Sequence, residues 1–173
     1  MLLRIVRVGE VPVDLQGIGK GILRVLRPQI SGFTVAGPVP PPEGALNRRR
    51  GQYSGDAILR FLLDLAGNRV LGITELDLFT PGLNFIFGIA QCPGRAAVVS
   101  LRRLRPEFYG LPPDTGLLLE RAVKECVHEI GHTFGLDHCR RKDCVMSFSN
   151  SVRDVDRKTP EFCEKCRARL PAR

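Results

Sequence analysis

Long apolar segments are missing from this sequence of 173 residues. No stretch approaches the roughly 18 consecutive apolar residues that a membrane-spanning helix needs, so we expect no membrane partner. The apolar start, MLLRIVRVGEV, is interrupted by Arg4 and Arg7 and therefore lacks the unbroken apolar region of a signal peptide. These absences predict a cytoplasmic protein with reduced thiols, in which clustered cysteines indicate a metal site more readily than disulfides.

Aromatic residues are scarce as well, at 6% of the chain. The formal net charge of +8 is concentrated in runs such as Arg48–Arg50 and Arg140–Lys142, and a basic balance of this kind can mark a nucleic-acid partner. No aromatic residues are interleaved with these runs to stack on bases. We therefore interpret the basic residues as a solvated surface and do not expect nucleic acid as a partner.

Hydrophobic patterning predicts one domain that combines helices and strands. With 43% hydrophobic and 25% charged residues, the chain has enough apolar material for a core of its own. The expected strands lie at 2–8, 32–37, 69–79, 84–91 and 96–101, and the expected helices follow Asp14, run from Ser54 to about Leu65, and span 115–134. Residues 38–55, rich in proline, glycine and arginine, are predicted to form a surface loop. This order favours an α+β fold with a mixed twisted sheet, two backing helices and a further helix near the C-terminus.

Only three histidines occur, and all lie in CVHEIGHTFGLDHC at residues 126–139. His128 and His132 are four residues apart on the predicted helix, so their imidazoles lie one above the other and can converge on one metal ion. Gly135 permits the chain to reverse, and His138 is then the next available imidazole. Three neutral imidazoles and a water make an open tetrahedral zinc site, which supplies the chemistry of peptide-bond hydrolysis.

Glu129 lies about 100° round the helix from His128, near enough to reach a water on the ion, and its predicted role is general base. Helical phase places an apolar stripe on the other side, so the histidines of this active-site helix are expected to face away from the core. The stripe consists of Leu119, Ala122, Val123, Cys126 and Ile130. The alternative, a chance HExxH match on an ordinary helix, requires the third histidine and the glycine to coincide as well.

Four cysteines follow the helix in the spacing C-x4-C-x18-C-x2-C, at Cys139, Cys144, Cys163 and Cys166. Two close pairs separated by a loop favour a closed four-thiolate zinc site, with two disulfides as the alternative. Residues 136–173 are too few to build a core of their own, so an ion is expected to hold this C-terminal subdomain together. Residues 1–135 form the N-terminal subdomain, and the whole is expected to be one compact domain.

His138 and Cys139 are adjacent in the sequence, but we expect them to bind different ions. His138 belongs to the first site, with the other histidines, and Cys139 to the second, with the other cysteines. An extended backbone allows this, because successive side chains then point to opposite sides. Met146 follows Cys144 closely, so the same loop could lay its thioether beneath the first ion, and a simple buried methionine is the alternative. Cys92 and Cys126 have no metal-ligand spacing and are predicted to be packed thiols.

At these residues the chain resembles a known family. HEIGHTFGLDH followed by a downstream methionine is similar to the metzincin zinc peptidases, and HEIGHTFGLDHC with C-x4-C-x-M and a later C-x-x-C resembles the archaemetzincins in particular. The similarity extends to LGITELDLFTPGLNFIFGIAQ and AVVSL, and so covers most of residues 69–166. The resemblance implies a metzincin-like fold, a catalytic zinc on the three histidines, Glu129 as general base, Met146 in the methionine turn and a structural zinc on the four cysteines.

Metzincins bind extended substrate by adding it to an edge strand above the cleft. The segment NFIFGIAQ, at residues 84–91, resembles that strand. The expected substrate-binding residues are therefore Phe85, Ile86, Phe87 and Gly88.

The sequence as a whole predicts a monomeric zinc metallopeptidase with two zinc ions. It is expected to hydrolyse short peptides through a zinc-bound water that Glu129 activates. Two alternatives stay open. A catalytically silent, zinc-dependent peptide-binding protein would share both sites, whereas a nucleic-acid-binding zinc protein would use the cysteine knuckle and the arginines and give no reason for Glu129.

Overall fold

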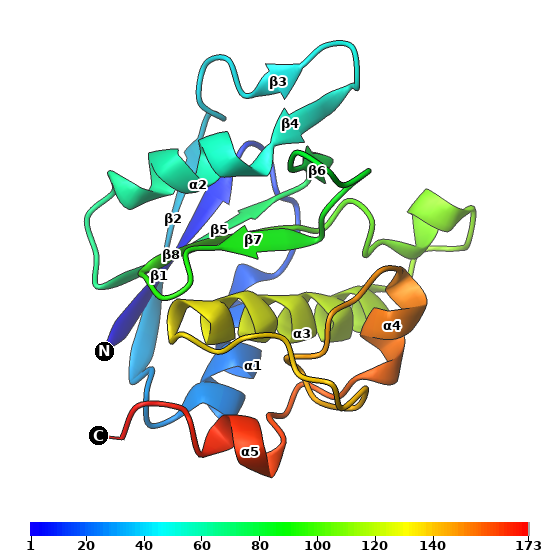
Figure 1. Ribbon diagram of the computed structural model, residues 1–173. Coiled ribbons are helices and arrows are strands. Elements are labelled where there is room, and N and C mark those ends of the chain that lie inside the picture. The colour runs from blue at the N-terminus through cyan, green and yellow to red at the C-terminus, as the bar shows by residue number, and fades with distance from the viewer. Residues whose placement is uncertain (173) are drawn as a thin grey trace.

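The computed structural model describes residues 1–172, which form a central sheet with helices on both faces (Figure 1). The strands are β1 (Leu2–Val8), β2 (Gly32–Val39), β3 (Leu46–Asn47), β4 (Gln52–Ser54), β5 (Arg69–Thr74), β6 (Leu78–Phe79), β7 (Gly88–Ala90) and β8 (Ala96–Ser100). The helices are α1 (Leu15–Leu26), α2 (Gly55–Leu63), the 3-10 turn η1 (Pro106–Tyr109), α3 (Thr115–Thr133), α4 (Val152–Arg157) and α5 (Glu164–Arg167). The predicted mixed sheet of an α+β domain is confirmed.

The main sheet has the strand order β2-β1-β5-β8-β7. Its first four strands are parallel, and β7 pairs antiparallel with β8 at the edge. Every residue of β5 and β8 is buried, as expected for central parallel strands that are covered on both faces. A second, smaller sheet joins β3, β4 and β6.

Two apolar cores lie on opposite faces of the main sheet. On one face, Ile58 and Leu62 of α2 pack with Val70 and Val98 of the central strands. On the other face, α1 and α3 share the larger core with the strands. The two helices that back the sheet therefore cover opposite faces, with α2 alone on one and α1 beside α3 on the other (Figure 1).

Several element boundaries differ from the sequence predictions. The predicted strand at 69–79 ends at Thr74, and the predicted strand at 84–91 is reduced to Gly88–Ala90. The reason is that the Ile86 amide donates to the Leu78 carbonyl at 2.9 Å, so the chain pairs with β6 before it joins β8. The predicted surface loop at 38–55 contains β3 and β4, and the prediction that it lacks regular structure is wrong.

The longest helix, α3, is buried on its polar side as well as on its apolar stripe. Arg121, Lys124, Glu125 and His128 are all buried, so the side of the helix opposite its apolar stripe is covered rather than open to solvent. The C-terminal segment covers this side and adds its own apolar side chains to the larger core. Helical phase alone could not reveal the covering segment, because it is distant in sequence. Among residues 1–172, no helix combines the length and the apolarity that crossing a bilayer requires.

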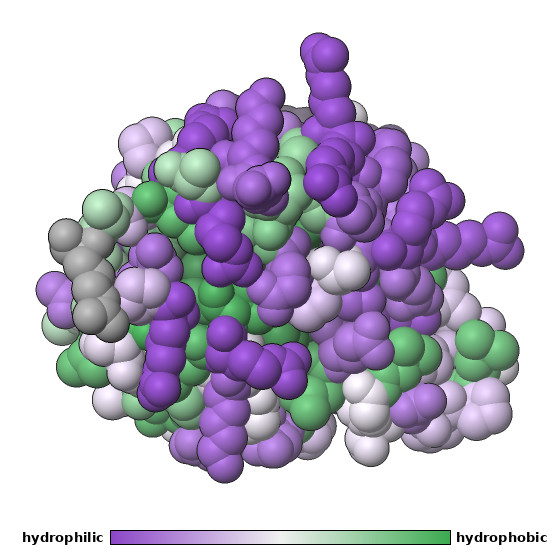
Figure 2. Space-filling model, turned by 90° about the horizontal axis from the view of Figure 1, so that it is seen from below, coloured by the Kyte–Doolittle hydropathy of each residue, from purple (hydrophilic) through white to green (hydrophobic). Residues whose placement is uncertain are grey.

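The basic side chains lie mainly at the surface. Seen from below, the molecule shows mostly hydrophilic side chains, many of them projecting outward, with apolar areas between them (Figure 2). Several arginines lie in ion pairs, including Arg103 with Asp77 at 2.7 Å and Arg141 with Asp143 at 2.7 Å. This pairing is consistent with a solvated surface, as the composition predicts.

The core beneath α2 gives the first testable prediction. A Cβ added to Gly72 of β5 would lie 2.6 Å from Leu62 Cδ1, so the Leu62 side chain rests directly on the sheet. We expect Leu62→Ala to lower the free energy of unfolding by about 2–5 kcal/mol, because it leaves a cavity there. Leu111→Ala, at an exposed position, is the control and should change it by less than about 0.5 kcal/mol. Equal effects in denaturant unfolding would contradict this packing.

Candidate metal centre

Helix α3 and the turn after it bring the three histidines to one point. Asp114 caps the helix by accepting a hydrogen bond from the Leu117 amide at 2.9 Å. His128 and His132 lie one turn apart, with their Nε2 atoms 3.1 Å from each other. The chain reverses at Gly135, whose φ of +87° favours glycine, and returns His138 to the same place. One ligand nitrogen from each ring lies within 4.8 Å of the others.

The outer nitrogens of two rings are fixed by backbone carbonyls. His128 Nδ1 donates to the Val145 carbonyl at 2.7 Å, and His132 Nδ1 donates to the Leu136 carbonyl at 2.7 Å. Since a carbonyl can only accept, each Nδ1 carries the proton and each Nε2 presents a lone pair to the centre. This is the tautomer that a metal ligand needs.

Burial and neighbouring positive charge keep the imidazoles neutral. Burial lowers the pKa of His128 well below its usual value, and the charges of Lys158 and His132 lower it further. The pKa values of His132 and His138 are lowered as well, chiefly by burial. Ligands at about 2.0 Å from a tetrahedral zinc lie about 3.3 Å apart, which is close to the 3.1 Å between the two Nε2 atoms. Donor type, tautomer and spacing therefore fit zinc.

Glu129 is only 5% exposed and lines the same cavity as the three histidines. Burial raises its pKa well above the usual value, and the carboxylate of Glu125 raises it further, while Lys158 lowers it. Gly88 of β7 lies directly over this side chain, because an added Cβ there would be 2.7 Å from Glu129 Cγ. Gly88 is the first residue of the edge strand β7, and since it has no side chain, the Glu129 side chain lies directly against its backbone.

The cavity in front of the histidines has a volume of about 420 Å³. It is lined by the segment 83–90, which includes all four residues predicted to bind substrate, and also by Phe148, Ser149 and Asn150. Of the four, only Gly88 lies in a strand, and Phe87 is largely buried in the core. The prediction of one continuous strand over residues 84–91 is wrong, because Ile86 pairs with Leu78 before the chain enters β7.

Met146 is fully buried beneath the same turn of α3. A Cβ added to Gly131 would overlap with the Met146 sulfur, so the thioether packs against the backbone between His128 and His132. The loop after Cys144 therefore places the methionine under the histidines.

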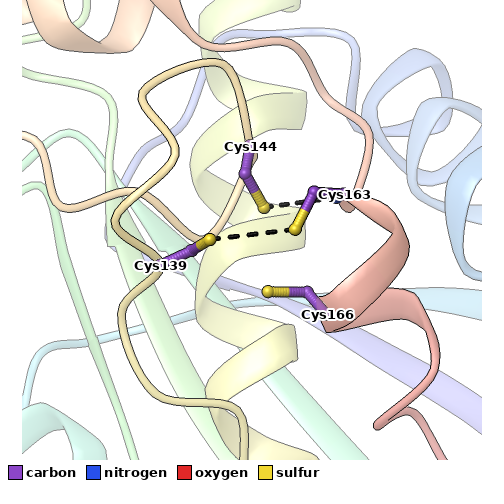
Figure 3. Close-up of side chains that lie close together, drawn as sticks. All are labelled: Cys139, Cys144, Cys163 and Cys166. Atoms are coloured by element: carbon purple, nitrogen blue, oxygen red, sulfur yellow. Dashed lines mark hydrogen bonds between the residues drawn. The ribbon is translucent and has the colours of Figure 1, made fainter.

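The four C-terminal cysteines also converge, from the 139–144 loop and from the start of α5 (Figure 3). Their sulfur atoms all lie within 4.8 Å, and the Cys139 and Cys163 sulfurs are 3.8 Å apart. Four thiolates at about 2.3 Å from a tetrahedral zinc lie about 3.8 Å from one another, whereas a disulfide is about 2.05 Å long. All six cysteines are free thiols, so the two-disulfide alternative is not supported.

One thiol of this cluster loses its proton easily. The pKa of Cys163 is about 7, because hydrogen bonds from the other cysteines lower it more than burial raises it. A thiolate is the form that binds a metal. The pKa values of Cys144 and Cys166 are instead raised, chiefly by burial. The fit of the cluster to a zinc ion therefore rests on its geometry and its four sulfur donors.

The two clusters meet at adjacent residues. The Cys139 amide donates to the Met146 carbonyl at 2.8 Å, and Cys139 forms a parallel bridge with Ser147. The backbone is therefore extended at this point, so that His138 and Cys139 can serve different centres.

Some residues near the centre were missed by the sequence reasoning. Glu125 lines the cavity one turn before Glu129, a spacing that helical periodicity could have revealed. Lys158 reaches the same place from beyond α4, and no local spacing points to it. Cys92 is exposed and lines the cavity, so the prediction that it is packed is wrong, because it lies in the turn between β7 and β8. Cys126 is fully buried, as predicted.

Three convergent imidazoles, a buried glutamate and a mixed sheet with an antiparallel edge strand define a zinc metallopeptidase of the metzincin type. The model of Peptidase family M54 matches residues 37–172. The chain belongs to this family, the archaemetzincins, as its sequence motifs predict.

Similar proteins agree with this assignment. The archaemetzincin of Methanopyrus kandleri is 56% identical over 127 residues, which cover 72% of this chain and 69% of the relative. The crystal structure of archaemetzincin from the same organism has a TM-score of 0.83 at 46% identity, covering 96% of this chain and 91% of the other. The crystal structure of a zinc-dependent peptidase from Methanocorpusculum labreanum has a TM-score of 0.87 at 30% identity, covering 98% and 100%.

The contact between Gly131 and Met146 gives a prediction for this centre. An added Cβ at Gly131 has no room beside the Met146 sulfur. We expect Gly131→Ala to lower the free energy of unfolding by about 1–3 kcal/mol through overpacking and to weaken metal binding at the histidines.

The matched control is Gly116→Ala in the same helix, where the nearest atom to an added Cβ is 3.5 Å away. It should stabilise the protein slightly, because alanine favours helix. Thermal unfolding and zinc titration of both variants are the measurements. Unimpaired zinc binding by Gly131→Ala would show that Met146 does not support the centre.

Proposed function

We propose that the chain hydrolyses peptide bonds in short peptides at the three-histidine centre, with Glu129 as the general base. The observation that carries this proposal is the buried carboxylate of Glu129 in the same cavity as three imidazoles whose free lone pairs converge. A carboxylate in that position can take a proton from a water that the imidazoles' metal holds.

The three histidines and Glu129 would have different roles in hydrolysis. His128, His132 and His138 would hold a zinc ion, which supplies Lewis-acid polarisation of the scissile carbonyl and activation of water. Glu129 takes the proton of the attacking water and passes it to the departing amine nitrogen. Burial raises the pKa of Glu129, which makes its carboxylate a stronger base for the first transfer.

Peptide binding is proposed along the outer edge of β7. This strand pairs with β8 on one side only, and its residues Gly88, Ile89 and Ala90 all line the cavity. An extended peptide can add to such an edge through backbone hydrogen bonds, which give affinity with little sequence selectivity. A cavity of about 420 Å³ lies near the small end of the range for ligand pockets, which favours short peptides over folded proteins.

Two zinc ions per chain are proposed, one at the histidines and one at the four cysteines. The open histidine cluster leaves a position for water and substrate, as catalytic zinc requires. The cysteine cluster is closed by four sulfur ligands and would have a structural role. We also propose a monomer in the cytoplasm, a compartment that keeps thiols such as these six reduced.

The general-base role is tested by Glu129→Gln, which keeps the shape of the side chain but removes its basic carboxylate. We expect the turnover of short peptides to fall by about 10²–10⁴-fold, with the zinc content and the far-UV circular dichroism unchanged. Cleavage of a mixture of short peptides, followed by mass spectrometry, is the measurement. Turnover equal to that of the wild type would reject the mechanism. Tight peptide binding by a wild-type chain that cleaves nothing would favour the silent peptide-binding alternative.

The proposed number of ions is tested by metal content per chain. We expect two zinc ions in the wild type and one in each of the variants His132→Ala and Cys163→Ser. Only the cysteine variant should also lose much stability, because the ion helps to hold the C-terminal segment. Elemental analysis and thermal unfolding give both readouts. A wild type with one zinc, or a Cys163→Ser variant that keeps two, would contradict the assignment.

A further inference from the structure

Lys158 is the largest fully buried side chain in the described part of the chain, and 0% of that side chain is exposed. It follows α4 directly and points its ammonium group into the space between α3 and the turn that contains Met146. Its Nζ lies 2.8 Å from Glu125 Oε1 and donates a hydrogen bond to the Ser147 carbonyl at 3.2 Å. It also lies 3.5 Å from His128 Nδ1. One buried cation thus touches the active-site helix, the methionine turn and a candidate metal ligand.

Stability is a poor explanation for this arrangement. Burying an ion pair costs about as much desolvation as the attraction returns, and apolar residues of the same volume often serve equally well. Glu125 is 2% exposed, and its Oε1 makes no hydrogen bond of good geometry within residues 1–172. The Lys158 charge is therefore what compensates this carboxylate. A lysine at this position needs a reason other than folding energy.

The hydrogen bonds of the Val145–Ser147 segment indicate why a lysine occupies position 158. The Val145 carbonyl accepts the hydrogen bond from His128 Nδ1 and so fixes the orientation of the His128 ring. Ser147, whose carbonyl Lys158 binds, lies two residues further along the same segment. The side chain of Met146, between them, packs under the histidines. Anchoring the Ser147 carbonyl to α3 through Lys158 and Glu125 would thus fix both the ring orientation and the methionine.

We propose that Lys158 is a positioning residue of the metal centre, which joins Glu125 on α3 to the Ser147 carbonyl and thereby holds the Val145–Ser147 segment that orients His128. This inference rests on the proposed metal site at the histidines. It does not require that the bound metal cleaves peptides. Partners that orient a metal-binding histidine commonly change metal affinity by about 10–100-fold when they are removed.

The test is Lys158→Met, which keeps the apolar stem and removes the ammonium group. Lys124→Met is the matched control, because Lys124 is also buried, also on this side of α3, and pairs with Glu120 at 2.8 Å. Lys124 binds the Asp156 carbonyl rather than the methionine turn. This control reproduces the loss of a buried ammonium group, although its partner Glu120 is exposed. The cost of leaving the buried Glu125 unpaired is removed in the double variant described below.

The readout is cobalt(II) binding to the zinc-depleted protein. Cobalt bound by thiolates gives charge-transfer bands in the near ultraviolet, which report the filling of the cysteine site. The change in the visible spectrum once those bands have saturated then reports cobalt at the histidines. We expect Lys158→Met to bind cobalt at the histidines about 10–100-fold more weakly and with an altered visible spectrum. Lys124→Met should stay within about threefold of the wild type, and the cysteine site should fill normally in both.

If Lys158→Met does not fold, the double variant Lys158→Met with Glu125→Leu replaces the ion pair by apolar residues, an exchange that proteins often tolerate. It should fold and keep the weakened cobalt affinity, because the Ser147 carbonyl has still lost its anchor. Wild-type affinity and spectrum in the folded Lys158 variant, or equal losses in the Lys158 and Lys124 variants, would overturn the proposal. A wild-type chain that binds cobalt at the histidines but cleaves no peptide would end the proposed peptidase function and leave this inference intact.

Discussion

The site depends on the packing of the C-terminal segment against the polar side of α3. The helix supplies His128, Glu129 and His132 at the right spacing, but helix geometry alone does not orient their side chains. The carbonyls of Leu136 and Val145 hold two of the rings, and both belong to the segment that follows the helix. Metal-binding geometry is therefore a tertiary property of this protein, although its ligands are nearly contiguous in the sequence.

The same segment couples the two metal clusters mechanically. His138 and Cys139 are adjacent in the chain, and the Cys139 amide is bonded to the carbonyl of Met146. The segment that carries Cys163 and Cys166 is joined to the same loop by a hydrogen bond from the Val145 amide to the Glu161 carbonyl at 2.9 Å. An ion at the cysteines would thus stiffen the backbone that presents the third histidine and supports the methionine. This arrangement gives a short segment with little core of its own a fixed place on the helix.

Local sequence signals predicted much of this protein. The spacings of the histidines and of the two cysteine pairs favour one arrangement over the alternatives, and the structure brings each set together. The fold class also followed from the order of apolar patterns. Contacts with distant parts of the chain were not predicted. The polar side of α3 is covered by residues such as Val145, 17 positions from His128, and Lys158 lies 30 positions from that histidine. The short β7 strand was overestimated because its apolar pattern continues through Ile86, whose backbone pairs with β6 instead.

The metal centre at the three histidines is tested most directly by an anomalous diffraction map, recorded at the zinc edge, from crystals of the zinc-loaded protein. We expect one peak at about 2.0–2.1 Å from a nitrogen of each of His128, His132 and His138, and a second at about 2.3 Å from the four cysteine sulfurs. A map without the first peak, in which the three rings point to separate environments, would contradict the central claim that the covered side of α3 builds a metal centre.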